Sequence, residues 1–498
     1  MLTTRIFTPI ANGGVGTVVA LLIGVAGCGG SRAAPGSAAP VSLRIGFGLV
    51  TGASAEDADP ISLDIGIQGL AGNIATELLV SPAQDGRTGA GVAESWAVSS
   101  DGLVWRIQLR PGLRFHDGTP ADAAAVREIV ATRLPRELGP SFEDVDQIRT
   151  AGDDLEITLR RRSTFLIEAL TGISIRKPGG IGTGPFRSTG QTGNTIEMAA
   201  NADYYGGKPS LDRISIKPYP SVRAAWADLL RGEVDMLYDV GIDALDSLKS
   251  SNEVNLFPFQ RGYAYLLLLN PQQPQLRDPA FRRELNAAID RDALIADGLN
   301  GHGAPALGPV WPHHWAYRAS FPQLAYHPRP PSATAPRRRL SILIGEPSQE
   351  RLALVLQRQL QAIGVDTVLE PVTDAFDRVR AGKFDAVLVD AVQGPNMVRP
   401  SLFWHTGGPY NWGHYSNQQV DAALDSIRHA VDDEAYQNGV AAFQRAIVDD
   451  PPAIFLSWRE RARAVSKRFV VPPDPGADVL TTIHLWRPAA NTMTRARN

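Results

Sequence analysis

The sequence of 498 residues contains a single cysteine, Cys28. One thiol excludes an intrachain disulfide framework and any zinc or iron–sulfur site built from several cysteines. The fold must therefore be held by ordinary hydrophobic cores. Because 498 residues exceed what one core usually supports, we expect two or three domains.

The segment that precedes Cys28 has the features of an export signal. It carries Arg5 and then an apolar run over residues 15–26, which is shorter than the roughly 20 residues that a membrane-spanning helix needs. The sequence Val-Ala-Gly-Cys at 25–28 resembles the bacterial lipobox, in which the cysteine receives a lipid and becomes the first residue after cleavage. We therefore expect a lipoprotein signal peptide at 1–27, lipidation of Cys28, and a flexible tether at 28–40. The mature body would be held through this lipid to the periplasmic or extracellular face of a membrane.

Composition and motifs narrow the function. The formal net charge of −3 gives no general attraction to nucleic acid, so no nucleic-acid partner is expected. The sequence has no Gly-x-Ser-x-Gly, His-Glu-x-x-His or P-loop motif, and we expect neither an enzyme nor a bound cofactor. A secreted hydrolase remains a remote alternative, because catalytic triads are spatial rather than sequential.

Strand-like and helix-like segments alternate along the chain, which favours α/β architecture. The clearest unit is a strand at 340–345, a helix with Leu352, Leu356, Leu360 and Ile363 on one face, and a strand at 365–370. Such units place strands in parallel, and ligands bind outside their carboxyl ends. The other expected elements are strands at 41–49, 104–115, 155–160 and 384–390, helices at 122–134 and 373–381, and a Pro- and Arg-rich loop at 327–339.

Four stretches, in order, carry a family resemblance. They are VAESWAVSSDGLVWRIQLRPGLRFHDGTPADAAAV (92–126), GTGPF (182–186) with NADYYGGKPSLDRISIKPYPSVRAAWADLLRGEVDM (201–236), LLLLNPQQPQLRDPAFRRELNAAIDRDALI (266–295), and YSNQQVDAAL (415–424) with DDPPAIFLSW (449–458). Together they resemble the family 5 extracellular solute-binding proteins, the peptide- and nickel-binding components of ABC importers.

The resemblance implies an α/β, two-lobed periplasmic-binding-protein-like fold of the class II or cluster C type, with an extra subdomain in lobe I. Lobe I would comprise 41–66, 180–262 and 459–498, the subdomain 67–179, and lobe II 263–458. Two hinge strands would join the lobes, one of them near 263–270, and closure around a ligand would be a hinge motion.

The function implied is that of the substrate-binding component of an ABC importer. A monomer would capture a small solute, peptide-like or other, between its lobes and deliver it to ABC permease and ATPase subunits. Two alternatives stay open: binding of a nickel or other metal chelate for uptake, and a sensory lipoprotein that does not transport.

The resemblance also places the loop at 391–417 in the ligand cleft. Aromatic side chains offer a large contact area at a modest entropic cost, and their polar edges can orient a ligand. The candidate ligand-binding residues are therefore Phe403, Trp404, Tyr410, Asn411 and Trp412 in the loop, with Tyr263, Tyr265 and Asn270 on the hinge strand as further candidates.

One departure from the family concerns charge. Peptide binders of this family place an Asp in this loop to pair with the α-amino group of the peptide. Here the corresponding positions are near Gln393 and Gly394, and no acidic residue occurs from Ala391 to Val420. A buried ammonium without a counter-charge costs several kcal/mol. A peptide with a free N-terminus is therefore disfavoured. His405 and His414 flank the aromatic residues and keep the metal-chelate alternative open, although no protein-bound metal is expected.

Overall fold

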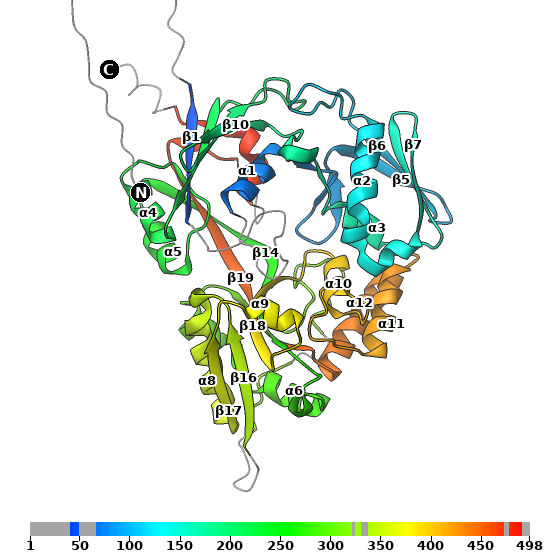
Figure 1. The fold of residues 1–498 in the computed structure, drawn as a ribbon, viewed down its shortest axis with the longest axis vertical. Coiled ribbons are helices and arrows are strands. Elements are labelled where there is room, and N and C mark those ends of the chain that lie inside the picture. The colour runs from blue at the N-terminus through cyan, green and yellow to red at the C-terminus, as the bar shows by residue number, and fades with distance from the viewer. Residues whose placement is uncertain (1–39, 49–65, 321–323, 330–336, 473–477, 491–498) are drawn as a thin grey trace, which may run out of the picture. The chain divides into compact units, whose positions relative to one another are not determined.

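The computed structural model describes residues 40–48, 66–320, 324–329, 337–472 and 478–490, and the part from Pro40 onward forms one compact unit (Figure 1). The predicted signal peptide at 1–27, Cys28 and nearly all of the 28–40 tether lie outside the described residues. Among the described residues, no helix is long and apolar enough to cross a membrane.

One large mixed sheet runs through this unit. The strands are hydrogen-bonded in the order β10 (Phe186–Thr192), β11 (Thr195–Ala200), β12 (Arg213–Tyr219), β1 (Ser42–Gly48), β13 (Met236–Leu237), β19 (Ala453–Ser466), β14 (Val254–Leu269), β18 (Ala386–Val392), β16 (Arg338–Ile344) and β17 (Val365–Pro371). A short strand, β15 (Ala304–Pro305), also pairs with β19. The first five strands belong to the predicted lobe I and the last three to lobe II, so β14 and β19 connect the two.

The pairing of β14 with β19 shifts in register twice near its middle, between Gln260 and Ala264 and between Tyr265 and Leu266. Gln260 pairs with Glu460, and the next paired residues are Ala264 and Trp458. This shift in register lies at the positions where the sequence predicts the lobe boundaries, 262/263 and 458/459. Those boundaries themselves stay a prediction.

The lobe I part of the sheet is covered on both faces. The helix α1 (Ile67–Ala75) packs against Leu43, Ile45 and Phe47 of β1. The helices α4 (Val222–Leu230) and α5 (Ile242–Lys249) pack on the other face, against Leu237 and the alanines of β19. Successive residues of β19 point to opposite faces of the sheet, so its apolar side chains contribute to both of these cores.

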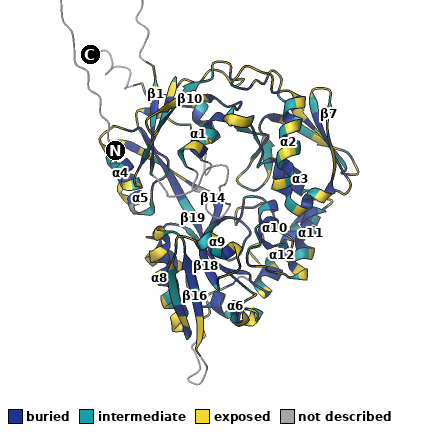
Figure 2. Ribbon diagram, viewed as in Figure 1, coloured by how far each residue is buried: buried dark blue, intermediate teal, exposed yellow. Residues whose placement is uncertain are grey.

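The lobe II part also has a core on each face. On one face lie α6 (Pro279–Ala287), α7 (Arg291–Gly298) and α8 (Glu350–Ala362). On the other lie α10 (Val398–Trp404), α11 (Gln418–Arg428) and α12 (Asp433–Asp449). Figure 2 shows this organisation as dark blue strands beneath helices whose outer sides are yellow.

The predicted βαβ unit is confirmed. The strands β16 and β17 pair in parallel, and α8, which connects them in the sequence, buries Leu352, Leu356 and Leu360. A short helix, α9 (Ala375–Arg380), then leads to β18, which is parallel to β16. The boundaries differ from the predicted ones by up to two residues, and the arginines at 338 and 339 belong to β16 rather than to the preceding loop.

The segment 67–179 contains a four-stranded antiparallel sheet ordered β5 (Ala93–Val98), β6 (Val104–Leu109), β8 (Asp154–Leu159) and β7 (Val145–Ala151). The alternating burial of β6 confirms the half-buried strand, but this strand ends at Leu109 and not at 115, since Pro111 and Gly112 form a turn. The helix α2 (Ala123–Leu138) is capped by Asp122 and continues past Pro135, four residues beyond the expected end. It packs beside the short helix α3 (Phe165–Leu170).

The same segment shares a hydrophobic core with α10, α11 and α12 of lobe II. The remaining short strands pair locally as β2 (Glu77–Leu78) with β9 (Ser174–Ile175), β3 (Val80–Pro82) with β4 (Thr88–Ala90), and β20 (Phe469–Val470) with β21 (Arg487–Pro488).

Candidate functional site

The loop after β18 begins with a buried crossing of two glycines. The backbone N–H groups of Gln393 and Gly394 both donate to the carbonyl of Gly262 on β14, at 2.6 and 3.0 Å. A Cβ placed on Gly262 would lie 2.4 Å from Cα of Gly394, so neither chain can move aside for a side chain. This contact fixes the start of the loop against the connecting strand.

Phe403 and Trp404 are the most buried of the predicted ligand residues in the loop. Trp404 is 1% exposed, and its Nε1 donates to Oε1 of Gln393 at 2.8 Å. Its ring lies edge-on to Phe455 of β19, with centroids 5.6 Å apart. The two aromatics at the end of α10 thus pack into the core beneath the loop. Direct contact of either ring with a ligand stays a prediction.

Tyr410 and Trp412 are partly exposed and form an aromatic cluster above that core. Their ring centroids are 5.5 Å apart, and both rings contact Phe403. Trp412 also meets Phe376 of α9 edge-on at 5.5 Å. The elements that follow the parallel strands β17 and β18, which flank β16, therefore converge here, as expected at the carboxyl ends of such strands.

A groove of about 420 Å³ opens on this loop. It is lined by Arg380, Thr406, Gly407, Gly408, Pro409, Asn411, Trp412, His414, Tyr415 and Ser416. Asn411 shapes it from within: its Oδ1 accepts the backbone N–H of Tyr415 at 2.9 Å and its Nδ2 donates to the carbonyl of Tyr415 at 2.7 Å. We call these residues the aromatic groove. They combine two aromatic faces with amide, hydroxyl and backbone groups, a lining suited to a small polar ligand.

The hinge-strand candidates have different environments. Tyr263 is buried, whereas Tyr265 is partly exposed and lies under the guanidinium of Arg459, 5.1 Å from its ring centroid. Arg459 in turn forms an ion pair with Asp390 of β18. Asn270 is buried, and its Nδ2 donates to the carbonyls of residues 384 and 382 at 2.9 and 3.2 Å. Asn270 thus braces the backbone after β14, and its role towards a ligand stays a prediction.

The histidines near the groove do not form a metal cluster. Nδ1 of His405 accepts the backbone N–H of Gly407 at 3.1 Å, and its Nε2 lies 4.0 Å from Asp421. His414 is exposed and lines the groove. Within the described ranges, no three His, Cys, Asp or Glu side chains are placed to hold a metal ion.

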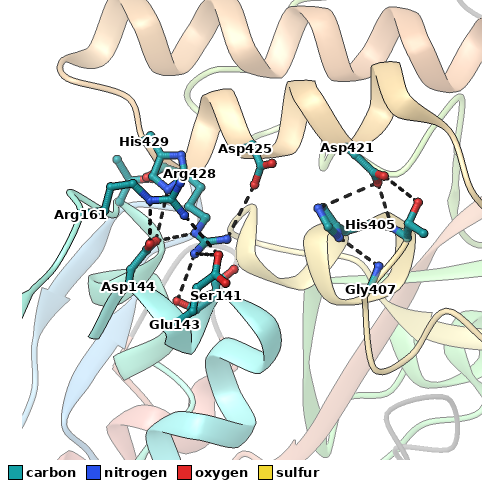
Figure 3. A network of polar contacts seen from close by, with 12 residues as sticks. Ser141, Glu143, Asp144, Arg161, His405, Gly407, Asp421, Asp425, Arg428 and His429 are labelled. Atoms are coloured by element: carbon teal, nitrogen blue, oxygen red, sulfur yellow. Dashed lines mark hydrogen bonds and ion pairs between the residues drawn. The ribbon is translucent and has the colours of Figure 1, made fainter. Parts of the chain in front are cut away.

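A buried charge network lies beside the groove, between the 67–179 segment and α11 (Figure 3). Nε of Arg428 donates to Oδ2 of Asp144 at 2.6 Å, and both side chains are almost fully buried. Burial raises the pKa of Asp144, but hydrogen bonds from His429, Arg428 and Arg161 outweigh this effect and hold the pKa at about 2. Asp144 is therefore ionised at neutral pH, because its charged partners compensate for the cost of burying a carboxylate.

Sequence reasoning missed one residue that bears on the loop, Glu168 of α3. Its carboxylate accepts the backbone N–H groups of Met397 and Val398 at 2.9 and 2.8 Å, at the start of α10. The available signal was a single acidic residue within the apolar run FLIEAL at 165–170. A charge on a buried helix face is informative because it needs a partner.

Comparison with known proteins agrees with this architecture. The family model of bacterial extracellular solute-binding proteins, family 5, matches residues 88–413. The probable D,D-dipeptide-binding periplasmic protein DdpA of Escherichia coli is 25% identical over 76% of this chain and 80% of its own length. The glutathione-binding protein GsiB of Pectobacterium atrosepticum is 26% identical over 77% and 83%.

Solved structures share the fold. NikZ from Campylobacter jejuni, in complex with Ni(L-His), has a TM-score of 0.75 at 21% identity and covers 90% of this chain and 99% of its own. AppA from Bacillus subtilis, in complex with a nonapeptide, has a TM-score of 0.75 at 19% identity and covers 90% and 100%. The relatives are binding proteins rather than enzymes. Since the family model spans more than half of the sequence, the chain belongs to the family 5 bacterial extracellular solute-binding proteins, the two-lobed substrate-binding components of ABC importers.

Proposed function

We propose that this chain is a lipid-anchored, monomeric receptor that binds a small solute against the aromatic groove and presents it to an ABC permease. The observation that carries the proposal is the groove of about 420 Å³ at the carboxyl ends of the lobe II strands, which is lined by the partly exposed Trp412. The partly exposed Tyr410 packs against Trp412. Cys28 would hold the receptor to the membrane, and the residues up to 40 would act as its tether.

The charges around the loop favour a ligand without a free α-amino group. No acidic residue occurs from 391 to 420, and Gln393, near the position expected to hold an Asp, is 1% exposed and accepts the indole N–H of Trp404. Oδ2 of Asp390, on β18 before the loop, forms an ion pair with Arg459. A ligand ammonium buried at this loop would therefore find no carboxylate among residues 391–420, and burial without a counter-charge is costly. N-blocked or otherwise modified peptides and uncharged polar solutes meet no such penalty.

A nickel or metal chelate is a second candidate, which one observation favours. His414 is exposed, lines the groove, and could donate one imidazole to a chelate that brings its other ligands with it. The structural neighbour NikZ is complexed with Ni(L-His).

A screen with paired ligands tests the proposal. The purified full chain is heated with a set of peptides, each supplied with a free and with an acetylated N-terminus, and with Ni(L-His), while mass spectrometry identifies any small molecule that co-purifies. Ligand binding raises the melting temperature by mass action. We expect acetylated or other amine-free compounds to raise it more than their free-amine partners. A consistent preference for free amines would contradict the ligand class, and a co-purified ligand whose affinity is unchanged in Trp412→Ala would place the site elsewhere.

A further inference from the structure

Glu168 connects three elements that are far apart in the sequence. Besides the two N–H groups of α10, its carboxylate accepts the hydroxyl of Tyr436 on α12, with an O–O distance of 2.5 Å. The backbone carbonyl of Glu168 also accepts Nδ2 of Asn396 at 3.2 Å. The three donors to its side chain are 229, 230 and 268 positions along the chain from it. A single carboxylate therefore ties α3 to the beginning of α10 and to α12.

This carboxylate is buried, and it forms no ion pair in the part of the chain that the structure describes. The neighbouring cations are engaged elsewhere. On the α2 and α10 side, Arg399 pairs with Glu137 at 3.1 Å. On the α12 side, Arg87 pairs with Asp433 at 3.1 Å.

The remaining titratable neighbours do not supply a positive charge. His314 stacks on Tyr436 with ring centroids 5.9 Å apart, and burial lowers its pKa to about 4, so it is neutral at neutral pH. Burial raises the pKa of Tyr436 well above its usual range, and the negative charge of Glu168 adds to this effect. Glu168 is thus surrounded by neutral donors.

Neutral donors leave part of the cost of burying a charge uncompensated. Burial raises the pKa of Glu168 to about 7, against the opposing hydrogen bonds from Tyr436, Val398 and Met397. By linkage, the arrangement in which Glu168 is buried binds a proton more tightly than one in which it is exposed to water. The buried arrangement is therefore favoured at mildly acidic pH, and this advantage is lost as the pH rises through about 7.

The position of α10 matters because this helix leads directly into the aromatic groove. Phe403, near the end of α10, contacts both Tyr410 and Trp412. The helix has only two turns, so a displacement at its start is passed to these rings. We propose that Glu168 is a proton-sensitive positioning residue. Its proton uptake removes the cost of burying its charge, which stabilises the packing of α3 against α10 and α12 and so stabilises the aromatic groove. Its relevance to solute binding rests on the proposed function, but the coupling itself does not.

Hydrogen exchange measures this coupling without a ligand. In the full chain, exchange of the amides of 397–404 is followed between pH 6 and 8.5 and corrected for the intrinsic effect of pH. We expect protection in the wild type to fall as the pH rises through about 7, by about tenfold per pH unit at most, since one proton is linked. Glu168→Gln keeps the shape and one acceptor but cannot titrate, so its protection should not change with pH. Glu137→Gln, next to α10 but in an ion pair, should keep the wild-type dependence.

A second variant keeps the test decisive if Glu168→Gln does not fold. The Tyr436 hydroxyl lowers the pKa of Glu168, so Tyr436→Phe should move the midpoint of the pH transition upward. A flat wild-type profile would overturn the proposal. So would a Glu168→Gln profile identical to that of the wild type, or an unmoved midpoint in Tyr436→Phe. None of these results depends on whether the groove binds the solute.

Discussion

Arg428 of α11 donates from Nε to Oδ2 of Asp144 at 2.6 Å, joining residues that are 284 positions apart. Nη2 of Arg428 reaches Glu143 at 3.0 Å, and His429 also contacts Asp144, at 3.2 Å. The pair ties the 67–179 segment to lobe II (Figure 3). Because both side chains are nearly inaccessible to water, the loss of either would leave a buried charge without its closest partner.

Removal of the Arg428 side chain should therefore destabilise the protein strongly. We expect Arg428→Ala to lower the free energy of unfolding by about 3–5 kcal/mol in urea denaturation, as observed for broken buried pairs. Arg337→Ala, at an ion pair with Asp366 whose two side chains are 74% and 49% exposed, is the matched control and should cost about 0–1 kcal/mol. Equal losses in the two variants would show that the buried network does not stabilise the fold.

The same network should make the protein sensitive to acid. The pKa of Asp144 is held at about 2 in the folded state, below its ordinary value of 3.8. Its contribution to stability is therefore complete above pH 4 and is lost as the pH falls through about 2. Melting temperatures between pH 2 and 5 should fall less steeply in Asp144→Asn than in the wild type. Parallel curves would assign the acid sensitivity to other carboxylates.

The two tryptophans of the loop should have separable roles. Trp412→Ala should weaken ligand affinity by about 1–3 kcal/mol in calorimetric titration with little loss of stability, because its ring is partly exposed. Trp404→Ala should instead lower the free energy of unfolding by about 3–5 kcal/mol, because its ring is 1% exposed and its indole N–H bonds to Gln393. A stable Trp404→Ala variant with lost binding would reverse the two assignments.

The glycine crossing should tolerate no side chain. In Gly262→Ala the new Cβ would meet backbone atoms of Gly394, which cannot rotate away. We expect a loss of about 1–3 kcal/mol in stability, typical of overpacking. Gly308→Ala, where nothing lies within 4 Å of the added Cβ, is the control and should be nearly neutral in the same denaturation series.

Lipidation at Cys28 can be tested by fractionation. Cys28→Ser removes the thiol that would carry the lipid, so we expect the protein to leave the membrane fraction or to remain unprocessed. A mutant that is still membrane-bound and cleaved at the normal position would exclude this anchor.

Local sequence patterns predicted the elements of lobe II well. The leucines at 352, 356 and 360 mark the buried face of α8, and the apolar runs on either side form its two parallel strands. Side-chain periodicity is a property of neighbouring residues, so a single segment reveals it. The order of the family-like stretches then supplied the two-lobed fold.

Burial within the aromatic loop could not be predicted in the same way. Trp404 and Trp412 are eight positions apart in one aromatic-rich segment, yet one lies in the core and the other lines the groove. Their difference arises from Gln393 at the start of the same loop, which accepts the indole N–H of Trp404, and from Phe455 of β19, which packs on its ring from a distant part of the sequence. The pairing of Asp144 with Arg428 and the position of Glu168 beneath α10 are contacts of the same long-range kind.

The interrupted pairing of β14 with β19 limits how the two halves of the molecule can move. Hydrogen-bonded pairs continue on both sides of the gap between Gln260 and Ala264, with one further shift between Tyr265 and Leu266, so sliding one strand along the other would break these hydrogen bonds. Translation of one half past the other therefore costs the hydrogen bonds of both strands. The residues between Gln260 and Ala264 have no partner in this ladder, so torsion of their peptide units breaks the fewest of its hydrogen bonds, beside the contact of Gly262 with Gly394.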